Sequence, residues 1–423
     1  MVLKFSLSNF YSIKDTLTVD FEAARISTAA TKELSDNVFT LNDKKYLKSI
    51  GVFGPNESGK TSIVKALSFC ISLIIYSYRN NEGVKFNFMP FKFDGYHERP
   101  STFSINFICD NTEYEYSFSL NRKEIISESL YYYPGKRKAK IFVRKEQVGK
   151  PKSEIYSFGD GFFVKPLDVA QSTGRNTLFI SRASQMDREL AKRIYSFFMQ
   201  DLLVGSPSIA NDYAVNLFNA NKPLLLQALK MADSDIIDIE VRKEKVTVPV
   251  MPAYLTSRRE VISGMPAMQT ETYIRFLTSH KKNPGIKFDL ELEESSGTVQ
   301  LFYLLLALLD VCRHGKTLVI DEFDLSLHTE LAEFITNLVH ASKNAQILFT
   351  SHNTNLIDTK KFRRDQIYFT NKKEDASTDF YSLYDFKDFR ENMDAEKGYL
   401  QGRFDAVPYV ASSVESIRKL FGE

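Results

Sequence analysis

The residues best suited to chemistry in this chain form one short glycine-rich run, Gly54 to Thr61, which reads Gly-Pro-Asn-Glu-Ser-Gly-Lys-Thr. The run matches G-x-x-x-x-G-K-[ST], a pattern in which backbone N–H groups turn inward around phosphate oxygens. Lys60 would add a point charge, and the Thr61 hydroxyl would bind Mg²⁺. The predicted phosphate contacts come from Gly54, Pro55, Asn56, Glu57, Ser58, Gly59, Lys60, Thr61 and Ser62.

Two local elements flank this loop. The run Ser49–Phe53 is typical of a buried strand, and the segment after the loop spaces Ile63, Leu67 and Cys70 along one apolar helical face. A strand before the loop and a helix after it are the context that a phosphate-binding loop requires. We therefore interpret the match as functional and not as a chance occurrence.

A pair of carboxylates closes a second predicted strand. Residues Thr317–Ile320 are apolar or β-branched, and Asp321 and Glu322 follow them directly. A buried parallel strand delivers such side chains to the sheet edge where ligands bind. There Asp321 would hold Mg²⁺ and Glu322 would polarise an attacking water. A surface pair that caps the next helix is the alternative, and the apolar run before it makes that interpretation weaker.

A histidine follows a third apolar strand. The segment Gln346–Ser351 ends directly before His352. A lone histidine is more often structural, but this one stands at a strand end shortly after the acidic strand. The position favours a role in sensing or orienting the terminal phosphate.

A polar turn precedes the apolar helix expected over Val299–Val311. Its sequence, Glu293-Glu-Ser-Ser-Gly-Thr298, has two interpretations. By itself it is typical of a helix N-cap. Placed just before the acidic strand, it is also a second anion-binding site, with contacts expected from Ser295, Ser296 and Gly297.

The amino-acid composition limits the classes of protein to which the chain can belong. It has 423 residues, 43% hydrophobic and 26% charged, as expected for a folded globular protein of two or three domains. The formal net charge is only +2, so bulk charge does not draw the chain onto nucleic acid or anionic lipid. Three cysteines lie far apart and form no CxxC pair, which favours a reducing compartment over disulfides or structural zinc.

No targeting or membrane segment is expected. The N-terminal residues alternate like a strand and lack the features of a signal peptide. The most apolar runs, 67–76 and 301–311, are shorter than the roughly 20 residues that cross a bilayer. We therefore expect a cytoplasmic protein with no membrane partner.

The element pattern predicts an α/β fold. Alternating strands at residues 2–7 and 17–21 precede the glycine loop, and residues 85–165 are β-rich and divided by turns, as in an antiparallel meander. Residues 186–235 have a helical pattern. From residue 286 onward strands and helices alternate, which predicts a parallel sheet.

These motifs, in this order, resemble those of ABC-type ATPases of the SMC and RecF branch. Asn9–Lys14 is similar to the opening strand turn of RecF-like heads, and Asp324–His328 to their D-loop. The resemblance implies that residues 293–298 are the signature, that Asp324 contacts the nucleotide site, and that Gln185, at the Q-loop position, is a catalytic residue and Mg²⁺ ligand.

The resemblance also implies four segments. Residues 1–84 would be the N-terminal part of the ATPase head with the P-loop, and 85–185 an antiparallel β lobe that ends in the Q-loop. Residues 186–285 would be a helical insertion with connecting strands, and 286–423 the C-terminal part of the head. The insertion is too short and lacks the heptads for a long coiled-coil arm.

Within that branch the chain is most similar to compact bacterial ATPases related to the OLD and abortive-infection families, such as AriA-type ATPases of PARIS phage-defence systems or Abi-type ATPases. The shared marks are Glu-Ser-Ser-Gly-Thr, Asp-Glu-Phe-Asp-Leu-Ser-Leu-His, Phe-Thr-Ser-His-Asn and the closing segment 398–408. Two positions depart from the pattern. Glu57 stands where a small residue is usual, and Ser296 replaces the first glycine of Ser-Gly-Gly.

The family relationship carries expectations about partners. ATP and Mg²⁺ would lie between the P-loop of one head and the signature of another, so at least a homodimer is expected. The chain continues about 70 residues past His352, which we expect to leave no room for a nuclease domain. A two-component defence system is therefore the first hypothesis, with a separate effector nuclease that is released on sensing a phage-encoded trigger protein.

Two alternatives remain. One is a RecF-like DNA-binding ATPase in repair, in which the basic clusters 136–140 and 258–259 would contact phosphate. A solvated hairpin tip or a salt-bridged surface is the more usual explanation of such clusters. The other is a binding module without activity. The complete set of hydrolytic residue types disfavours it, and the near-neutral charge favours the defence ATPase over the repair protein.

Overall fold

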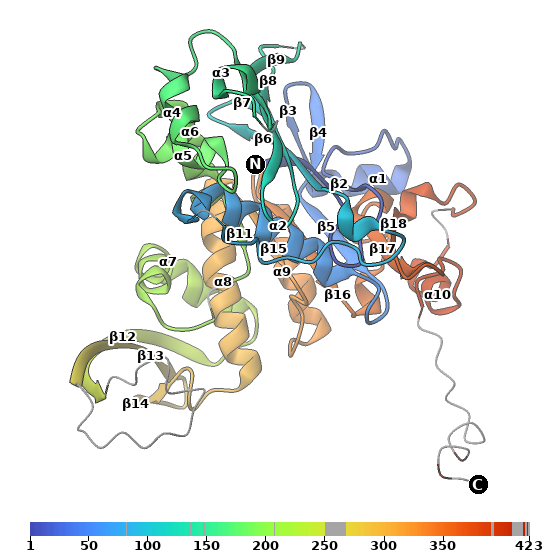
Figure 1. Ribbon diagram of the computed structural model, residues 1–423. Coiled ribbons are helices and arrows are strands. Elements are labelled where there is room, and N and C mark those ends of the chain that lie inside the picture. Colours follow the sequence, from blue (N-terminus) through green and yellow to red (C-terminus); the bar gives the residue numbers. More distant parts are fainter. Residues whose placement is uncertain are drawn as a thin grey trace. The chain divides into compact units, whose positions relative to one another are not determined.

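The computed structural model describes residues 1–423 except 82, 136, 147–148, 207, 250–267, 391–392, 408–417, 419–420 and 422–423. The chain divides into two compact units (Figure 1). Unit 1 comprises Met1–Gly205 and Val311–Glu423, and unit 2 comprises Ser206–Asp310. The four segments expected from the sequence follow other boundaries and stay a prediction.

Unit 1 contains a six-stranded sheet that is parallel except at one edge. Its order is β11-β15-β16-β5-β17-β18, and only β18 runs antiparallel to its neighbour. The strands are β11 (Leu202–Val204), β15 (Thr317–Ile320), β16 (Gln346–Ser351), β5 (Ser49–Phe53), β17 (Ile367–Lys372) and β18 (Thr378–Ser382). The predicted parallel sheet is therefore confirmed. The short edge strand β11 lies in a stretch expected to be helical, because its three residues pair with β15.

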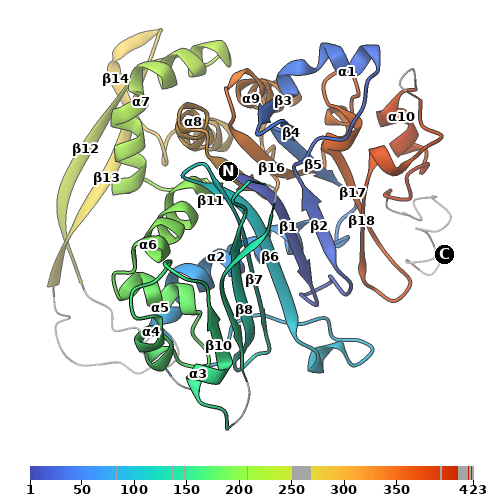
Figure 2. The same ribbon diagram turned by 90° about the horizontal axis from the view of Figure 1, so that it is seen from above.

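The second sheet of unit 1 is antiparallel and has the order β10-β9-β8-β7-β6-β1-β2 (Figure 2). Its strands are β1 (Val2–Ser8), β2 (Leu17–Asp20), β6 (Ser101–Cys109), β7 (Thr112–Leu120), β8 (Ile125–Tyr132), β9 (Ala139–Lys145) and β10 (Tyr156–Phe158). The predicted meander is confirmed as β6 to β9. The N-terminal hairpin β1–β2 extends the same sheet, since β1 pairs with β6 along its length.

Helix α2 (Lys60–Tyr76) shares one hydrophobic core with both sheets. Its buried residues Ile63, Leu67 and Ile74 belong to the same cluster as Phe5 of β1 and Val52 of β5. The remaining helices of unit 1 are α1 (Ala29–Glu33), α3 (Lys152–Ile155), α4 (Pro166–Ser172), α5 (Phe179–Gln185), α6 (Glu189–Ser196), α9 (Thr329–Ala341) and α10 (Ala395–Leu400); a short β3–β4 hairpin (Val38–Leu41, Lys44–Leu47) completes it. Burial of α2 in this core fixes the position of the loop before it.

Unit 2 combines one helix with a long antiparallel sheet. Helix α7 (Asp212–Met231) is followed by β12 (Ile236–Pro249), β13 (Met268–His280) and β14 (Asn283–Asp289). Phe276 of β13 contacts the rings of Phe218 and Phe302 in the core. The sequence analysis expected a helical insertion with connecting strands over residues 186–285, and in this unit β12 and β13 pair along their whole lengths. Helix α8 (Ser296–His314) begins in this unit.

Two helical segments of the described residues are long and apolar enough to cross a membrane, Lys60–Arg79 and Ser296–His314. In each, 56% of the most apolar window is buried inside the protein. Burial of that kind is typical of a core helix in a folded domain, because the apolar residues already contact protein.

Candidate functional site

The glycine-rich loop joins the buried strand β5 to the start of α2, as predicted. All five residues of β5 are buried, and the loop ends at Gly59, which has a φ of 108°. A Cβ at this position would lie 2.0 Å from Thr378 Oγ1. Both the backbone conformation and the close neighbour therefore require glycine here.

Lys60 lies over this loop. Its Nζ donates hydrogen bonds to the carbonyl oxygens of Gly54 (2.8 Å) and Pro55 (2.9 Å). Burial lowers the pKa of Lys60 to about 8, although the nearby carboxylates of Glu322 and Asp321 oppose the shift. The two carboxylates and the lysine of the predicted site are therefore close enough to interact electrostatically.

Thr350 joins the two carboxylate residues to the neighbouring strand β16. Its Oγ1 donates to Asp321 Oδ1 at 2.6 Å and accepts from the backbone N–H of Glu322 at 2.8 Å. Asp321 and Glu322 lie at the carboxyl end of β15, beside the end of β16. The sequence analysis did not single out Thr350, although a hydroxyl directly after the apolar run of β16 was a signal for it.

His352 and Glu322 face each other at this edge of the sheet. His352 Nε2 lies 3.9 Å from Glu322 Oε1, and both side chains are a little under half exposed. Burial and then the charge of Lys60 lower the pKa of His352, while the nearby carboxylates oppose the shift. The imidazole is therefore neutral near pH 7, so that one ring nitrogen donates a hydrogen bond and the other accepts one.

A cavity of about 560 Å³ lies over the loop and contains the predicted Lys60, Glu322 and His352. Its other predicted members are Asn56, Glu57, Ser58, Gly59, Thr61 and Ser62. Residues that the sequence analysis missed also line it: Tyr11, Ser12, Met89, Pro90, Phe91, Lys92, Phe93, Lys372 and Ala376. No local pattern marks these residues, because they come from three separate parts of the chain that only the fold brings together.

The residues expected to bind Mg²⁺ are few but chemically suitable. Thr61 offers a hydroxyl from the first turn of α2, and Asp321 offers a carboxylate from the end of β15. Among the described residues no group of three or more His, Cys, Asp or Glu side chains forms a metal site. Magnesium in phosphate-transfer sites commonly takes one or two protein oxygens and fills the rest of its shell with phosphate and water. Thr61 and Asp321 fit that requirement.

Gln185 is absent from the residues that line this cavity, and its expected role as catalytic residue and Mg²⁺ ligand stays a prediction. Gln185 is exposed at the C-terminal end of α5. Helix α5 is attached to the far end of α2, because Tyr78 N donates to Ser181 Oγ (3.1 Å) and Arg182 donates to Tyr78 O (3.2 Å). That end of α2 is roughly 24 Å from Lys60 at about 1.5 Å per helical residue.

The predicted signature residues lie at the start of α8 in unit 2. Ser295 Oγ accepts a hydrogen bond from Thr298 N at 3.1 Å, so Ser295 acts as the N-cap of the helix. Ser295 and Ser296 are exposed, and Gly297 is partly buried. The N-cap interpretation is thus confirmed, and the exposed hydroxyls leave a second anion-binding role as a proposal.

The segment expected to be the D-loop connects β15 to α9. Ser351 Oγ donates to Asp324 Oδ2 at 2.7 Å, and burial raises the pKa of the Asp324 carboxyl. Leu325 is 62% exposed, and Ser326 has a φ of 65°. The loop is therefore anchored at Asp324 and displays an apolar side chain.

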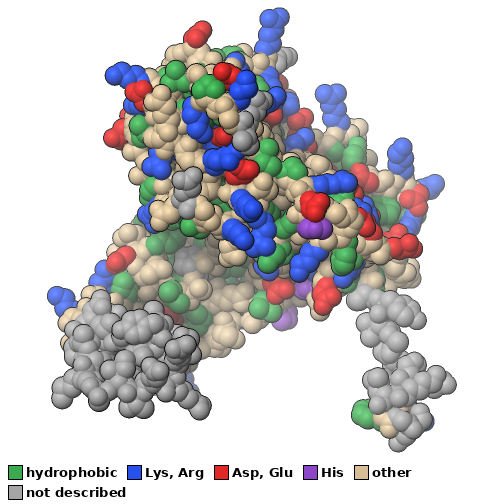
Figure 3. All heavy atoms as spheres, in the orientation of Figure 1, with side chains coloured by type: hydrophobic (Ala, Val, Ile, Leu, Met, Phe, Trp, Pro, Cys, Tyr) green, Lys and Arg blue, Asp and Glu red, His purple; other side chains and the backbone are tan. Residues whose placement is uncertain are grey.

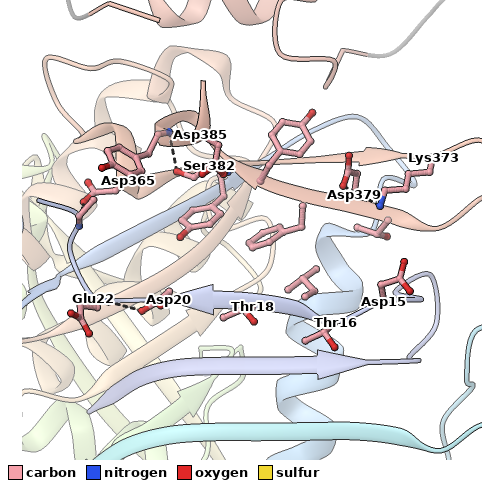
Figure 4. A pocket seen from close by; sticks show the side chains of 17 residues that line it. Asp15, Thr16, Thr18, Asp20, Glu22, Asp365, Lys373, Asp379, Ser382 and Asp385 are labelled. Carbon is pink, nitrogen blue, oxygen red and sulfur yellow. Dashed lines mark hydrogen bonds and ion pairs between the residues drawn. The ribbon is translucent and has the colours of Figure 1, made fainter. Parts of the chain in front are cut away.

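A second pocket, of about 450 Å³, lies between β2 and the β17–β18 hairpin (Figure 4). It contains none of the predicted site residues. The carboxylates of Asp20 and Asp379 are paired with Lys4 (2.7 Å) and Lys373 (3.4 Å), respectively. Its other labelled residues are Asp15, Thr16, Thr18, Glu22, Asp365, Ser382 and Asp385. The loop cavity is therefore the better candidate for chemistry.

Comparison with solved structures finds similarity to SMC head domains. It is similar to the SMC head domain from Thermotoga maritima, with 14% identity over 90% of this chain and 98% of that one and a TM-score of 0.40. It is also similar to the Smc head domain with an extended coiled coil bound to the C-terminal domain of ScpA, derived from Pyrococcus furiosus. That match has 12% identity over 96% and 99% of the two chains, with a TM-score of 0.38.

A search of curated proteins finds no match. One protein-family model matches residues 49–358, which include the glycine-rich loop, the carboxylate pair and His352. Its description is "AAA domain, putative AbiEii toxin, Type IV TA system". The match spans most of the chain, and the chain belongs to this AAA-domain family.

Proposed function

We propose that this protein binds ATP with Mg²⁺ and hydrolyses it to ADP and phosphate. The observation that supports this most directly is the single cavity that contains Lys60, Thr61, Glu322 and His352. The AAA-domain family and the strand–loop–helix geometry support the same assignment. Phosphoryl transfer depends mainly on positioning and charge stabilisation, and these residue types supply both.

Each residue has a proposed role. Lys60, now bonded to two loop carbonyls, would exchange them for oxygens of the β- and γ-phosphates. Thr61 and Asp321 would hold Mg²⁺, which when bound offsets charge on the phosphates. Glu322 would accept a hydrogen bond from the attacking water, and the neutral His352 would orient the γ-phosphate or that water.

We propose that the active form is at least a homodimer with composite ATP sites. Ser295 and Ser296 are exposed at the start of a 19-residue helix, where backbone N–H groups favour an anion from another molecule. The exposed Leu325 beside Asp324 is a second surface suited to a partner head. In this scheme ATP closes the dimer and hydrolysis opens it.

At the level of the cell we propose that the protein is the cytoplasmic sensor and scaffold of a two-component antiphage system. The family description names a putative AbiEii toxin of a type IV toxin–antitoxin system, and it supports the two-component character of this proposal only. The effector would be a toxic nuclease, released when a phage-encoded protein is sensed. The same proposal includes an assembly that is similar to that of PARIS or of another Abi-type system.

The RecF-like alternative receives less support. Of the basic clusters that motivated it, Lys136, Arg258 and Arg259 lie outside the described residues. Lys138 pairs with Glu115 at 2.6 Å, and Lys140 donates to Ser157 Oγ at 2.5 Å. Positive and negative side chains are interspersed on the face shown in Figure 3. Paired cations and mixed charge are typical of a solvated surface and not of a phosphate-binding one.

The test is purification of the Glu322→Gln protein with ATP and Mg²⁺ from cells that carry the neighbouring genes, followed by mass photometry. This substitution should preserve nucleotide binding and stall hydrolysis, so that the ATP-dependent assembly persists. A symmetric oligomer with a second protein supports the scaffold role. An oligomer that holds only nucleic acid favours the repair alternative, and a monomer contradicts the composite site.

A further inference from the structure

Part of the cavity lining is apolar and exposed, and we call this part its wall. Besides the polar residues of the glycine-rich loop, the cavity is lined by Tyr11 and by the segment Met89–Phe93, which follows α2 and precedes β6 in the chain. Tyr11 is 39% exposed, Met89 40% and Phe93 57%. Large apolar side chains that are exposed together at a cavity commonly mark a surface that a ligand covers.

The protein backbone holds this wall in place. Tyr11 N donates to Met89 O at 2.8 Å, and Phe91 N donates to Asn9 Oδ1 at 2.9 Å. The ring of Phe91 is buried and meets the ring of Phe93 edge-on, with centroids 5.6 Å apart. Phe91 therefore anchors the segment, and Phe93 is displayed at the cavity.

Lys14 fastens two of the loops that line the cavity. Its Nζ donates to Asp94 Oδ2 at 2.7 Å and to Asp375 Oδ2 at 2.8 Å. Asp94 follows Phe93 directly, and Asp375 precedes Ala376, another cavity residue. The ion pairs with Lys14 hold the pKa of Asp375 well below its usual range.

The wall lies beside the first turn of α2, where the phosphates are proposed to bind. Ser12 Oγ is 3.1 Å from Ser62 Oγ, which places the loop of Tyr11 beside the first turn of α2. Phosphates bound by Lys60 and Thr61 at that turn would leave the ribose and base to extend toward Tyr11 and the Met89–Phe93 segment. A flat base covers apolar side chains well, because every base presents an apolar face for stacking.

We propose that Tyr11, Met89 and Phe93 form the wall that binds the nucleotide base by stacking, and that Lys14 is a positioning residue that fixes this wall through Asp94 and Asp375. The inference rests on the proposed ATP binding and goes beyond it by assigning the base contact to the Met89–Phe93 segment. It separates two contributions to affinity, with phosphates bound by the glycine-rich loop and the base bound by a loop that precedes β6.

Calorimetry with two probes tests this. The full-length Phe93→Ala protein is titrated with Mg²⁺–ATPγS and, separately, with Mg²⁺–tripolyphosphate, which has the phosphates but no base. We expect ATPγS binding to weaken by about 5- to 100-fold, the range that loss of base–aromatic stacking produces, and tripolyphosphate binding to stay unchanged. Tyr384→Ala is the matched control, since Tyr384 is 43% exposed and lines the other pocket.

Lys14→Met tests the positioning role. It should weaken ATPγS binding without affecting tripolyphosphate, and its effect should largely disappear in the Phe93→Ala background, because both changes act on one wall. A merely structural lysine would instead lower the unfolding temperature, weaken both probes and add to Phe93→Ala. That result overturns the role of Lys14.

These titrations distinguish a failure of the proposed ATP binding from a failure of the proposed base-binding wall. If the wild-type protein binds neither probe, the proposed function is wrong and the base wall with it. If the wild-type protein binds both and Phe93→Ala keeps its ATPγS affinity, only the base wall is overturned.

Discussion

Thr350 Oγ1 donates a hydrogen bond of 2.6 Å to Asp321 Oδ1 and accepts one of 2.8 Å from Glu322 N. One hydroxyl on β16 therefore positions both of the adjacent carboxylate residues at the end of β15. Glu322 has a φ of 47°, an uncommon conformation for a residue with a side chain, and the bond to its N–H holds it there. Thr350 itself does not line the cavity, so we regard it as a positioning residue for the carboxylate pair.

The first prediction concerns that hydroxyl. Thr350→Val keeps the shape of the side chain but removes both bonds, so the partly buried Asp321 carboxylate and Glu322 N–H at the end of β15 lose this partner, at a cost of about 1–3 kcal/mol. We expect kcat for ATP hydrolysis to fall about tenfold, the change that 1.4 kcal/mol produces. Steady-state phosphate release measures it. Thr336→Val on α9 is the control, because that threonine is buried and bonds only its own helix.

A second prediction separates binding from chemistry at Glu322. Glu322→Gln keeps the size of the side chain but cannot accept a proton from water, so single-turnover hydrolysis should fall by about 10²- to 10⁴-fold. The affinity for Mg²⁺–ATPγS should stay within a few-fold of wild type, because Glu322 is not expected to hold the phosphates. Equal loss of binding and hydrolysis would mean that Glu322 is a ligand of the nucleotide and not the general base.

Much of this site was predictable because its chemistry is local in sequence. The loop at Gly54–Thr61 and the strand ends at Asp321 and His352 each combine an apolar run with a polar terminus, and parallel pairing then brings them to one edge. The antiparallel meander was predictable for the same reason, since each strand pairs with the next one.

What the sequence analysis missed depends on long-range packing. Lys14, Asp94 and Asp375 meet through loops that are 80 and 361 residues apart in the chain, and no local pattern marks such a contact. Gln185 was assigned from the motif order alone, and that order does not determine where α5 is attached. That attachment is made by Ser181 at the end of α2 remote from Lys60.

The third prediction concerns the tight contact at Gly59. A methyl group there meets Thr378 Oγ1 at 2.0 Å, and φ is 108°, so Gly59→Ala should lower the thermal unfolding temperature by several degrees and abolish nucleotide binding. Gly285→Ala, at an exposed position with no neighbour within 4 Å, should change neither quantity. Adding Thr378→Ala to Gly59→Ala removes the closest clash and should restore part of the lost stability. No recovery would mean that backbone strain alone accounts for the effect.

The last prediction concerns pH and follows from Lys60. Burial lowers its pKa to about 8, against the opposing charges of Glu322 and Asp321. Only the protonated amine attracts phosphate, so affinity should be constant below this pKa and should fall by up to about tenfold per pH unit above it. Titration with Mg²⁺–ATPγS between about pH 7 and pH 9.5 measures the change directly.

Lys60→Arg provides the control for this experiment. The guanidinium keeps its charge over the whole range, so the variant should bind more weakly because of its different shape, but its affinity should not depend on pH. Protonation of His352 does not interfere, since its lowered pKa places that change in the acid range. A wild-type affinity that is constant up to pH 9.5 would show that the Lys60 ammonium keeps its proton throughout, and that the neighbouring carboxylates outweigh its burial.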